Sequence, residues 1–177
     1  GMDGLCVGIS MLALTSFAVM GFHKGLFIEG ALTSLLIAAS LGFLRYNVSP
    51  ARIFLGDTGS LLLGFSIATF SIWNLQDKRE GFVVILPLAC LIVPIFDTML
   101  AVLRRTLRGT SIFAPDIEHI HHQILKFGIS NCQAVRLLLV VSGVGCILGF
   151  AVTFGGAYTS RVGSVLLALL FTFLLAM

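Results

Sequence analysis

Residues 133–154 read QAVRLLLVVSGVGCILGFAVTF, an apolar run whose only charged residue is Arg136. A helix needs about 20 mainly apolar residues to cross the hydrocarbon core of a bilayer, and this run is long enough. Further apolar runs of similar character lie at roughly 5–22, 30–45, 58–75, 82–103 and 162–177. The sequence therefore predicts an all-α protein, a polytopic transmembrane helical bundle with about six spans.

The composition supports a membrane protein. Hydrophobic residues make up 58% of the chain and charged residues 11%, and the mean hydropathy is +1.06. A soluble domain carries about a quarter charged residues. The chain has no basic run with interleaved aromatic residues, so nucleic acid is not an expected partner. Without an internal repeat, a low-complexity tract or a soluble linker, residues 1–177 are predicted to form a single membrane domain.

The polar connections are expected to alternate between the two sides of the membrane. One side then holds Asp3, the 46–57 loop and the 104–132 loop, and carries seven basic residues against four on the other side. Because cytoplasmic loops carry an excess of Lys and Arg, we expect these polar segments to face the cytoplasm. The predicted location is the plasma or inner membrane, with several passes and a cytoplasmic active face.

The segment 111–126, SIFAPDIEHIHHQILK, gathers His119, His121 and His122 close behind Asp116. The arginines just upstream are Arg104, Arg105 and Arg108. Arginine grips phosphate oxygens in a bidentate way, and histidine can donate to them or change its charge near neutral pH. The pattern favours a site for a metal-bound phosphate. The alternative is an ordinary polar loop between two membrane helices.

Two further polar segments are predicted on the same side. Residues 1–8, GMDGLCVG, contain Asp3, and residues 46–60, YNVSPARIFLGDTGS, contain Asp57. Asp57 stands where an apolar segment begins, and a helix start offers free N–H groups to an anion. A carboxylate there suits Mg²⁺, which prefers carboxylate, water and phosphate oxygens. The alternative for both aspartates is a helix cap.

Asp97 lies near the predicted cytoplasmic end of the 82–103 span. An ionisable side chain inside a span is costly and is a functional candidate by default. Arg104 and Arg105 follow two turns later, so a structural ion pair is an equal alternative. Both interpretations stay open.

Together these segments resemble the polyprenyl-phosphate N-acetylhexosamine-1-phosphate transferases, the WecA/TagO group related to MraY. The family's DGxDGLxxG, NxxPAxIFMGDTGS and PDRxHLHH motifs resemble residues 1–8, 47–60 and 115–122, respectively. In this chain Leu55 replaces Met, Ile117 replaces Arg and Ile120 replaces Leu. Asp97 also falls where the family has an aspartate. The resemblance covers about the first 130 residues.

The resemblance implies transfer of a sugar-1-phosphate from a UDP-sugar to polyprenyl (undecaprenyl) phosphate, with release of UMP, for cell-envelope polysaccharide synthesis. It implies an Mg²⁺-dependent enzyme, with Mn²⁺ as the alternative ion, and UDP-N-acetylhexosamine, polyprenyl phosphate and membrane lipid as partners; a homodimer is left open. Asp57 would hold the metal ion, while Asp3 would bind nucleotide or position phosphate. The histidines and arginines would hold the pyrophosphate. The remaining substrate-binding candidates are Asn47, Asp97 and Asp116.

The family members are about twice as long as this chain, and they carry an Asp-Asp pair that this chain lacks. We therefore expect the chain to correspond to the C-terminal half of the fold, with the carboxylate that activates the acceptor in the other half. Within the family, the resemblance implies transfer of GlcNAc-1-phosphate, and the alternative is phospho-MurNAc-pentapeptide transfer. Three alternatives lie outside the family. A metal transporter should place more acid or histidine pairs inside its spans, and a CDP-alcohol phosphotransferase needs a run of aspartates that this chain does not have. A membrane scaffold would leave the coincidence of the three motifs unexplained.

Overall fold

The computed structural model describes residues 2–74, 85–109, 111, 128–154 and 157–176. All regular secondary structure in these ranges is helical, which confirms the all-α prediction for this part of the chain. The helices are α1 (Leu5–His23), α2 (Phe27–Asn47), α3 (Gly56–Asn74), α4 (Ile85–Cys90), α5 (Ile92–Leu107), α7 (Asn131–Phe154) and α8 (Ala157–Ala176).

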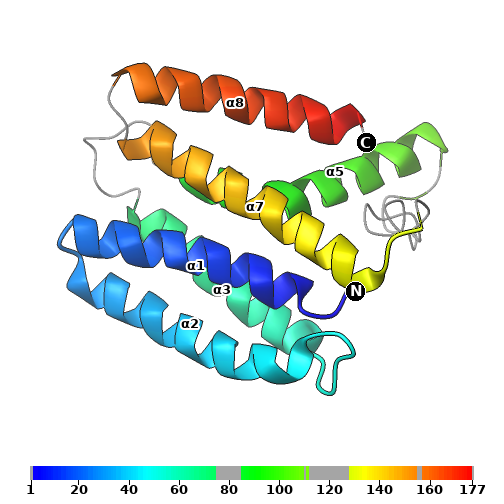
Figure 1. Ribbon diagram of the computed structural model, residues 1–177, viewed down its shortest axis with the longest axis horizontal. Coiled ribbons are helices and arrows are strands. Elements are labelled where there is room, and N and C mark those ends of the chain that lie inside the picture. Colours follow the sequence, from blue (N-terminus) through cyan, green and yellow to red (C-terminus); the bar gives the residue numbers. More distant parts are fainter. Residues whose placement is uncertain (1, 75–84, 110, 112–127, 155–156, 177) are drawn as a thin grey trace.

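Helix α1 forms the centre of a bundle and packs against α2, α3, α4 and α7 (Figure 1). Its side chains Leu14, Phe17 and Met20 are completely buried. The helix is apolar all round: most of its side chains pack on neighbouring helices, while Val19 and Phe22 are exposed apolar side chains. The core therefore lies around α1.

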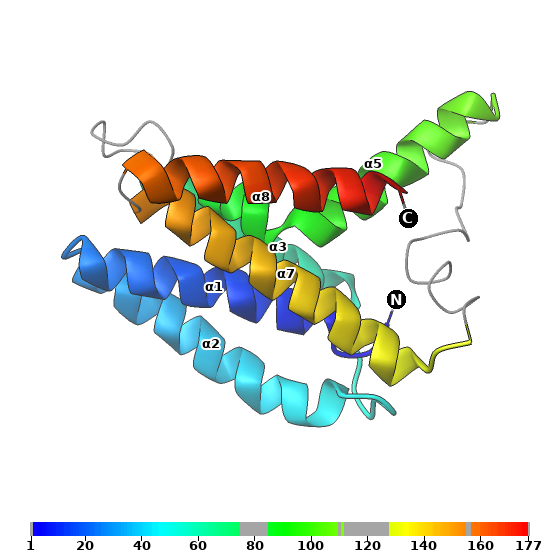
Figure 2. The ribbon, with the colours of Figure 1, turned by 45° about the horizontal axis from the view of Figure 1, so that its top comes forward.

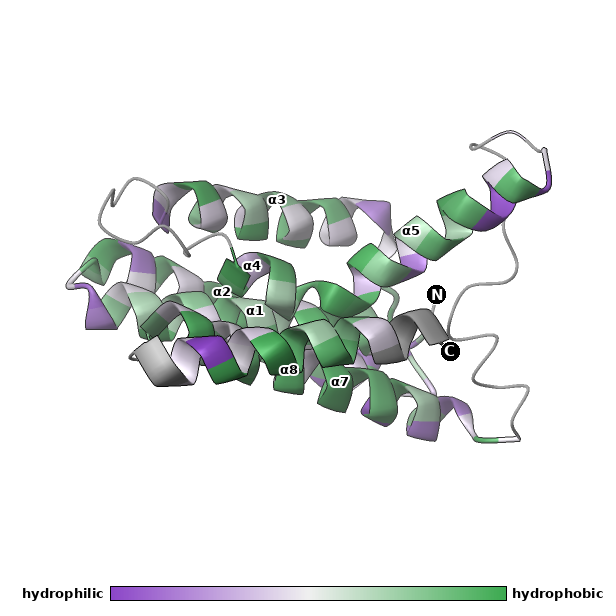
Figure 3. Cartoon of the chain, turned by 90° about the horizontal axis from the view of Figure 1, so that it is seen from above, coloured by the Kyte–Doolittle hydropathy of each residue, from purple (hydrophilic) through white to green (hydrophobic). Residues whose placement is uncertain are grey.

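The helices define two ends of the bundle. At the motif end, α1, α3 and α7 begin, while α2 and α5 end; the N label in Figure 1 marks this end. At the far end, α1 and α3 end and α2 begins. Apolar residues run along the helices, and hydrophilic residues gather toward the helix ends (Figure 3). The Asp3 and Asp57 segments thus reach the same end of the bundle.

Close contact between α4 and α7 depends on two glycines of α7. A Cβ atom at Gly145 would collide with the carbonyl oxygen of Ala89, and one at Gly149 would lie 2.8 Å from the Ala89 side chain. Small residues let membrane helices approach closely where hydrophobicity alone gives no preference for helix over lipid. These two positions set the distance between α4 and α7.

The segment predicted as one span over 82–103 is broken into α4 and α5 at Leu91. Pro94 explains the break, because a proline has no N–H to donate and its ring clashes with the carbonyl four residues earlier. That carbonyl belongs to Cys90, the last residue of α4. Pro94 itself lies in the first turn of α5, where a proline is tolerated.

Each of the other predicted segments contains a described helix, but fewer helices qualify as spans than expected. Among the described residues, α1, α2 and α7 are long and apolar enough to cross a membrane. The expectation of about six spans is therefore not confirmed. Gly, Ser, Thr and Asn residues lower the mean hydropathy of α3. The break before Pro94 leaves α4 and α5 too short to qualify as spans.

Candidate active site

Asp3 and Gly4 connect the start of α1 to the loop between α2 and α3. The Asp3 Oδ2 atom accepts a hydrogen bond from the Ala51 N–H at 3.1 Å. The Gly4 N–H donates to Asn47 Oδ1, also at 3.1 Å. Gly4 has φ +77°, a conformation that side chains disfavour. The first two motif segments, predicted to share a side, are thus in direct contact.

Asn47 organises this junction from the last turn of α2, where only 5% of its surface is exposed. Its Nδ2 atom donates to the Ile53 carbonyl at 2.8 Å. The Arg52 and Ile53 N–H groups both donate to the Tyr46 carbonyl, at 2.8 and 3.3 Å. The loop therefore folds back over the end of α2. The Asn47 side chain is hydrogen-bonded both to the start of α1 and to the returning loop.

The structure gives Asp3 a different role from the helix cap considered above. The N-cap residue of α1 is Gly4, and no side chain caps the helix. The Asp3 carboxylate instead holds the Ala51 backbone of the loop. Asp3 is half-buried.

Asp57 lies in the first turn of α3 and is exposed. Within the described ranges, no hydrogen bond reaches its carboxylate, so a capping role has no support there. Gly56 adopts φ +64°, and a Cβ at Gly59 would lie 2.5 Å from the Leu55 side chain. The glycines thus allow a tight turn into α3 that presents a carboxylate beside unpaired helix N–H groups.

The loop also forms a polar pocket of about 480 Å³. It is lined by Arg45, Tyr46, Val48, Ser49, Pro50 and Arg52. Sequence reasoning counted Arg45 and Arg52 only as charges that orient the protein. Both arginines line this pocket, and the Ser49–Pro50 peptide bond of the loop between them is cis. Two guanidinium groups on one pocket can bind an anion such as phosphate.

The α5 candidates lie along the helix that leads to the 111–126 segment. Asp97, Arg104 and Arg105 are half-buried, and Arg108 is exposed at the C-cap. Each of the four has an interaction partner. His119, His121, His122 and Asp116 lie outside the described residues. Among the described residues, no three His, Cys, Asp or Glu side chains group as metal ligands.

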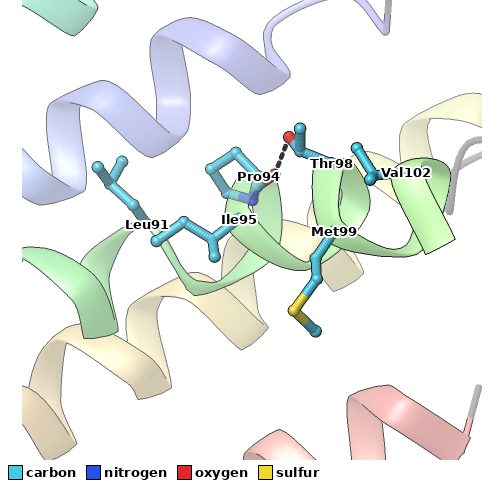
Figure 4. A pocket seen from close by; sticks show the side chains of 6 residues that line it. All are labelled: Leu91, Pro94, Ile95, Thr98, Met99 and Val102. Atoms are coloured by element: carbon cyan, nitrogen blue, oxygen red, sulfur yellow. Dashed lines mark hydrogen bonds between the residues drawn. The ribbon is translucent and has the colours of Figure 1, made fainter. Parts of the chain in front are cut away.

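An apolar groove of about 640 Å³ runs along α5 (Figure 4). Its lining residues come from α5 and the residue before it: Leu91, Pro94, Ile95, Thr98, Met99 and Val102. These positions recur every three or four residues and so form one helix face. Figure 2 shows α5 diverging from the other helices toward its carboxyl end. Sequence reasoning missed this groove, although the apolar spacing was visible.

Comparison with known proteins agrees with this geometry. The family model described as glycosyl transferase family 4 matches residues 1–74. Over these residues the chain is similar to the members of glycosyl transferase family 4. The match spans α1, α2 and α3 with the Asp3, Asn47 and Asp57 positions, so it covers the hydrogen-bonded junction. The resemblance found in the sequence motifs is confirmed.

Curated relatives match most of the length of this chain. A probable undecaprenyl-phosphate N-acetylglucosaminyl 1-phosphate transferase of Bacillus subtilis is 43% identical over 141 residues, which are 80% of this chain and 39% of the relative. A decaprenyl-phosphate N-acetylglucosaminephosphotransferase of Mycolicibacterium smegmatis is 34% identical over 90% of the chain and 42% of the relative. A phospho-N-acetylmuramoyl-pentapeptide-transferase of Clostridium botulinum is 36% identical over 85% and 44%. The chain spans about two fifths of the length of these relatives.

Proposed function

We propose that this chain takes part in transferring a sugar-1-phosphate from a UDP-sugar to polyprenyl phosphate at the motif end of the bundle. The observation that carries the proposal is the junction of Asp3, Asn47 and the 48–55 loop. It joins two segments with the family's motifs beside the exposed Asp57 carboxylate. The names of the relatives support the reaction class.

The reaction joins two anions, so its site must offset their repulsion. An oxygen of the acceptor phosphate attacks the sugar-bearing phosphorus, and the bond from that phosphorus to the UMP oxygen breaks. Atoms and charge balance with a lipid-linked pyrophosphoryl sugar and UMP as products. Basic groups at the motif end lower the energy of this approach because they neutralise charge that develops on phosphate oxygens.

The described residues fit an Mg²⁺ ion carried by substrate phosphates. Mg²⁺ in phosphoryl-transfer sites often takes only one or two protein carboxylates, with water and phosphate oxygens completing its shell. Asp57 offers one such carboxylate, exposed and without a hydrogen-bond donor among the described residues. When bound, the ion would polarise the phosphate oxygens. Asp57 would hold it, and Asp3 and Asn47 fix the loop that leads to Asp57.

The α5 groove supplies a place for the acceptor's hydrocarbon chain. Its lining is almost entirely apolar, and α5 runs from it to Arg104, Arg105 and Arg108 at the motif end. A polyprenyl phosphate has the same layout, with a long apolar tail and an anionic head. We assign the tail to the groove and the head to the arginine end.

For the donor we propose UDP-N-acetylglucosamine, on the cytoplasmic side of the membrane. The His-Ile-His-His sequence at 119–122 and the 43% identity to the Bacillus subtilis relative favour this sugar. The second candidate is the MurNAc-pentapeptide donor, because the Clostridium botulinum relative shares 36% identity.

The test is a radiolabelled transfer assay in membranes, with the longest form of the protein that the cell makes and with undecaprenyl phosphate. Asp57→Asn keeps the side-chain shape and removes its charge, and we expect turnover to fall by orders of magnitude with the protein still in the membrane. Asn131→Ala, an exposed change at the start of α7, is the control. Undiminished turnover in Asp57→Asn with unchanged Mg²⁺ dependence would contradict the proposed role.

The same assay separates the two donors. Label that enters lipid from UDP-N-acetylglucosamine supports the proposal. Label that enters only from the MurNAc-pentapeptide donor rejects the choice of sugar and keeps the reaction class. Absence of transfer from both donors, with the protein folded in the membrane, rejects the reaction class.

A further inference from the structure

Two polar side chains meet in the interior at the far end, away from every motif discussed above. Glu29 lies in the first turn of α2, and Asn74 is the last residue of α3. The exposed fractions are 0% for Glu29 and 1% for Asn74. A buried carboxyl group must find hydrogen-bond partners or lose its charge.

The Asn74 amide uses both of its N–H groups. Its Nδ2 atom donates to Glu29 Oε1 and to the Phe70 carbonyl, the latter at 2.9 Å. These two bonds fix the orientation of the amide, because a flip would set its oxygen against two acceptors. Two buried atoms then remain without a hydrogen bond, Glu29 Oε2 and Asn74 Oδ1.

The two remaining atoms are both acceptors as long as Glu29 is ionised. Carboxyl and carboxamide groups are planar and of similar size. When one N–H···O bond joins them edge to edge, the second oxygen of each lies beside the other. A proton on Glu29 Oε2 makes that atom a donor to Asn74 Oδ1. One proton therefore gives both atoms a hydrogen-bond partner.

The charges around Glu29 also need to be weighed. Lys24, at the C-cap of α1, acts electrostatically on the carboxyl group, and the start of α2 contributes the positive end of a helix dipole. His23 packs edge-on against Phe154, at a centroid distance of 5.3 Å. Lys24 and the dipole favour a carboxylate. Complete removal from water disfavours it more strongly, because one hydrogen bond from Asn74 does not replace a hydration shell.

We propose that Glu29 is a proton-binding site. In the native fold it is a neutral carboxylic acid whose Oε2–H donates to Asn74 Oδ1, while Asn74 Nδ2 donates back to Oε1. The result is a two-way acid–amide pair, the far-end pair. It links α2 to α3, both of which pack on α1. Since the same two helices carry Asn47 and Asp57 at the motif end, the far-end pair limits how far they can move apart.

The direct test is infrared difference spectroscopy of the protein in lipid nanodiscs at neutral pH, wild type against Glu29→Gln. We expect the wild type to show the carbonyl stretch of a protonated carboxylic acid, which shifts when the carboxyl groups are labelled with carbon-13. The band should be absent from Glu29→Gln. A carboxylate signal in place of this band would overturn the proposal.

Thermal unfolding provides the second readout. Glu29→Gln retains both bonds to Asn74, since the glutamine amide donates to Oδ1 and accepts from Nδ2, and it should melt within about 1 °C of the wild type. Asn74→Leu removes both bonds and should lower the melting temperature by roughly 5 °C. If Glu29 instead were a carboxylate held by Lys24, Glu29→Gln would leave that cation uncompensated. A fall in melting temperature for Glu29→Gln as large as that for Asn74→Leu would thus contradict the proton site.

Discussion

Replacing Asn47 with alanine should loosen the motif end without disturbing the membrane helices. The change removes the acceptor of the Gly4 N–H and the donor to the Ile53 carbonyl. Gly4 is buried, so its N–H is left without a partner at a cost of about 1–3 kcal/mol. Ile53 is exposed and its carbonyl can turn to water, which limits the second loss to about 0.5–1.5 kcal/mol. We expect the free energy of unfolding to fall by about 2–3 kcal/mol.

Hydrogen exchange and thermal unfolding in detergent measure this change. A loss of 2–3 kcal/mol corresponds to roughly 30- to 140-fold faster exchange at the Gly4 amide, if that amide exchanges by unfolding of the junction. The same loss lowers the melting temperature by about 4–12 °C in a chain of this size. Asn131→Ala is the matched control, since Asn131 is exposed. Equal Gly4 exchange and equal melting in the two variants would refute the role given to Asn47.

Three further predictions concern packing, lipid and topology. Gly145→Val should lower the melting temperature of the protein by roughly 5 °C or more, because the added side chain collides with the α4 backbone. The control Gly143→Ala should leave the melting temperature unchanged, because nothing lies within 4 Å of a Cβ atom at that position. Met99→Trp should fill the α5 groove and raise the KM for polyprenyl phosphate several-fold with little change in the KM for the UDP-sugar; equal effects on both would argue against a lipid groove. The third prediction uses single-cysteine variants and an impermeant maleimide added to intact cells. The maleimide should label Leu26→Cys at the far end and leave Cys132 at the motif end unlabelled. The reverse pattern would reject the assignment of the motif end to the cytoplasm.

The helices could be located from the sequence more reliably than their interruptions. Hydropathy located α1, α2 and α7 because each is a long apolar run, and it located α3 and α8 although polar residues interrupt them. It joined α4 and α5 because a window average does not register one missing N–H, although Pro94 and its clash with the Cys90 carbonyl follow from the sequence alone.

The site was predictable in outline only. The alternation of the connections across the membrane put Asp3 and Asp57 on one side, but spacing gave no reason to expect that Asp3 would hold the Ala51 backbone, 48 positions away. The partnership of Glu29 and Asn74, 45 positions apart, is equally a product of tertiary packing. In the sequence Glu29 is simply a charged residue near the start of an apolar run. Only the packing of α2 and α3 on α1 shows that no water reaches it.

The divergence of α5 from the bundle determines how an acceptor would arrive. Because the groove proposed for the lipid tail lies on an outward face of α5, a polyprenyl phosphate would enter it by lateral diffusion within the leaflet. Its encounter rate would then depend on the number of acceptor molecules per lipid and not on their number per volume of water. Diluting an assay with buffer would leave transfer per enzyme unchanged, whereas diluting the vesicles with inert phospholipid would slow it. For this step the membrane would act as a two-dimensional solvent, and the grooved face of α5 would be the part of the protein in contact with it.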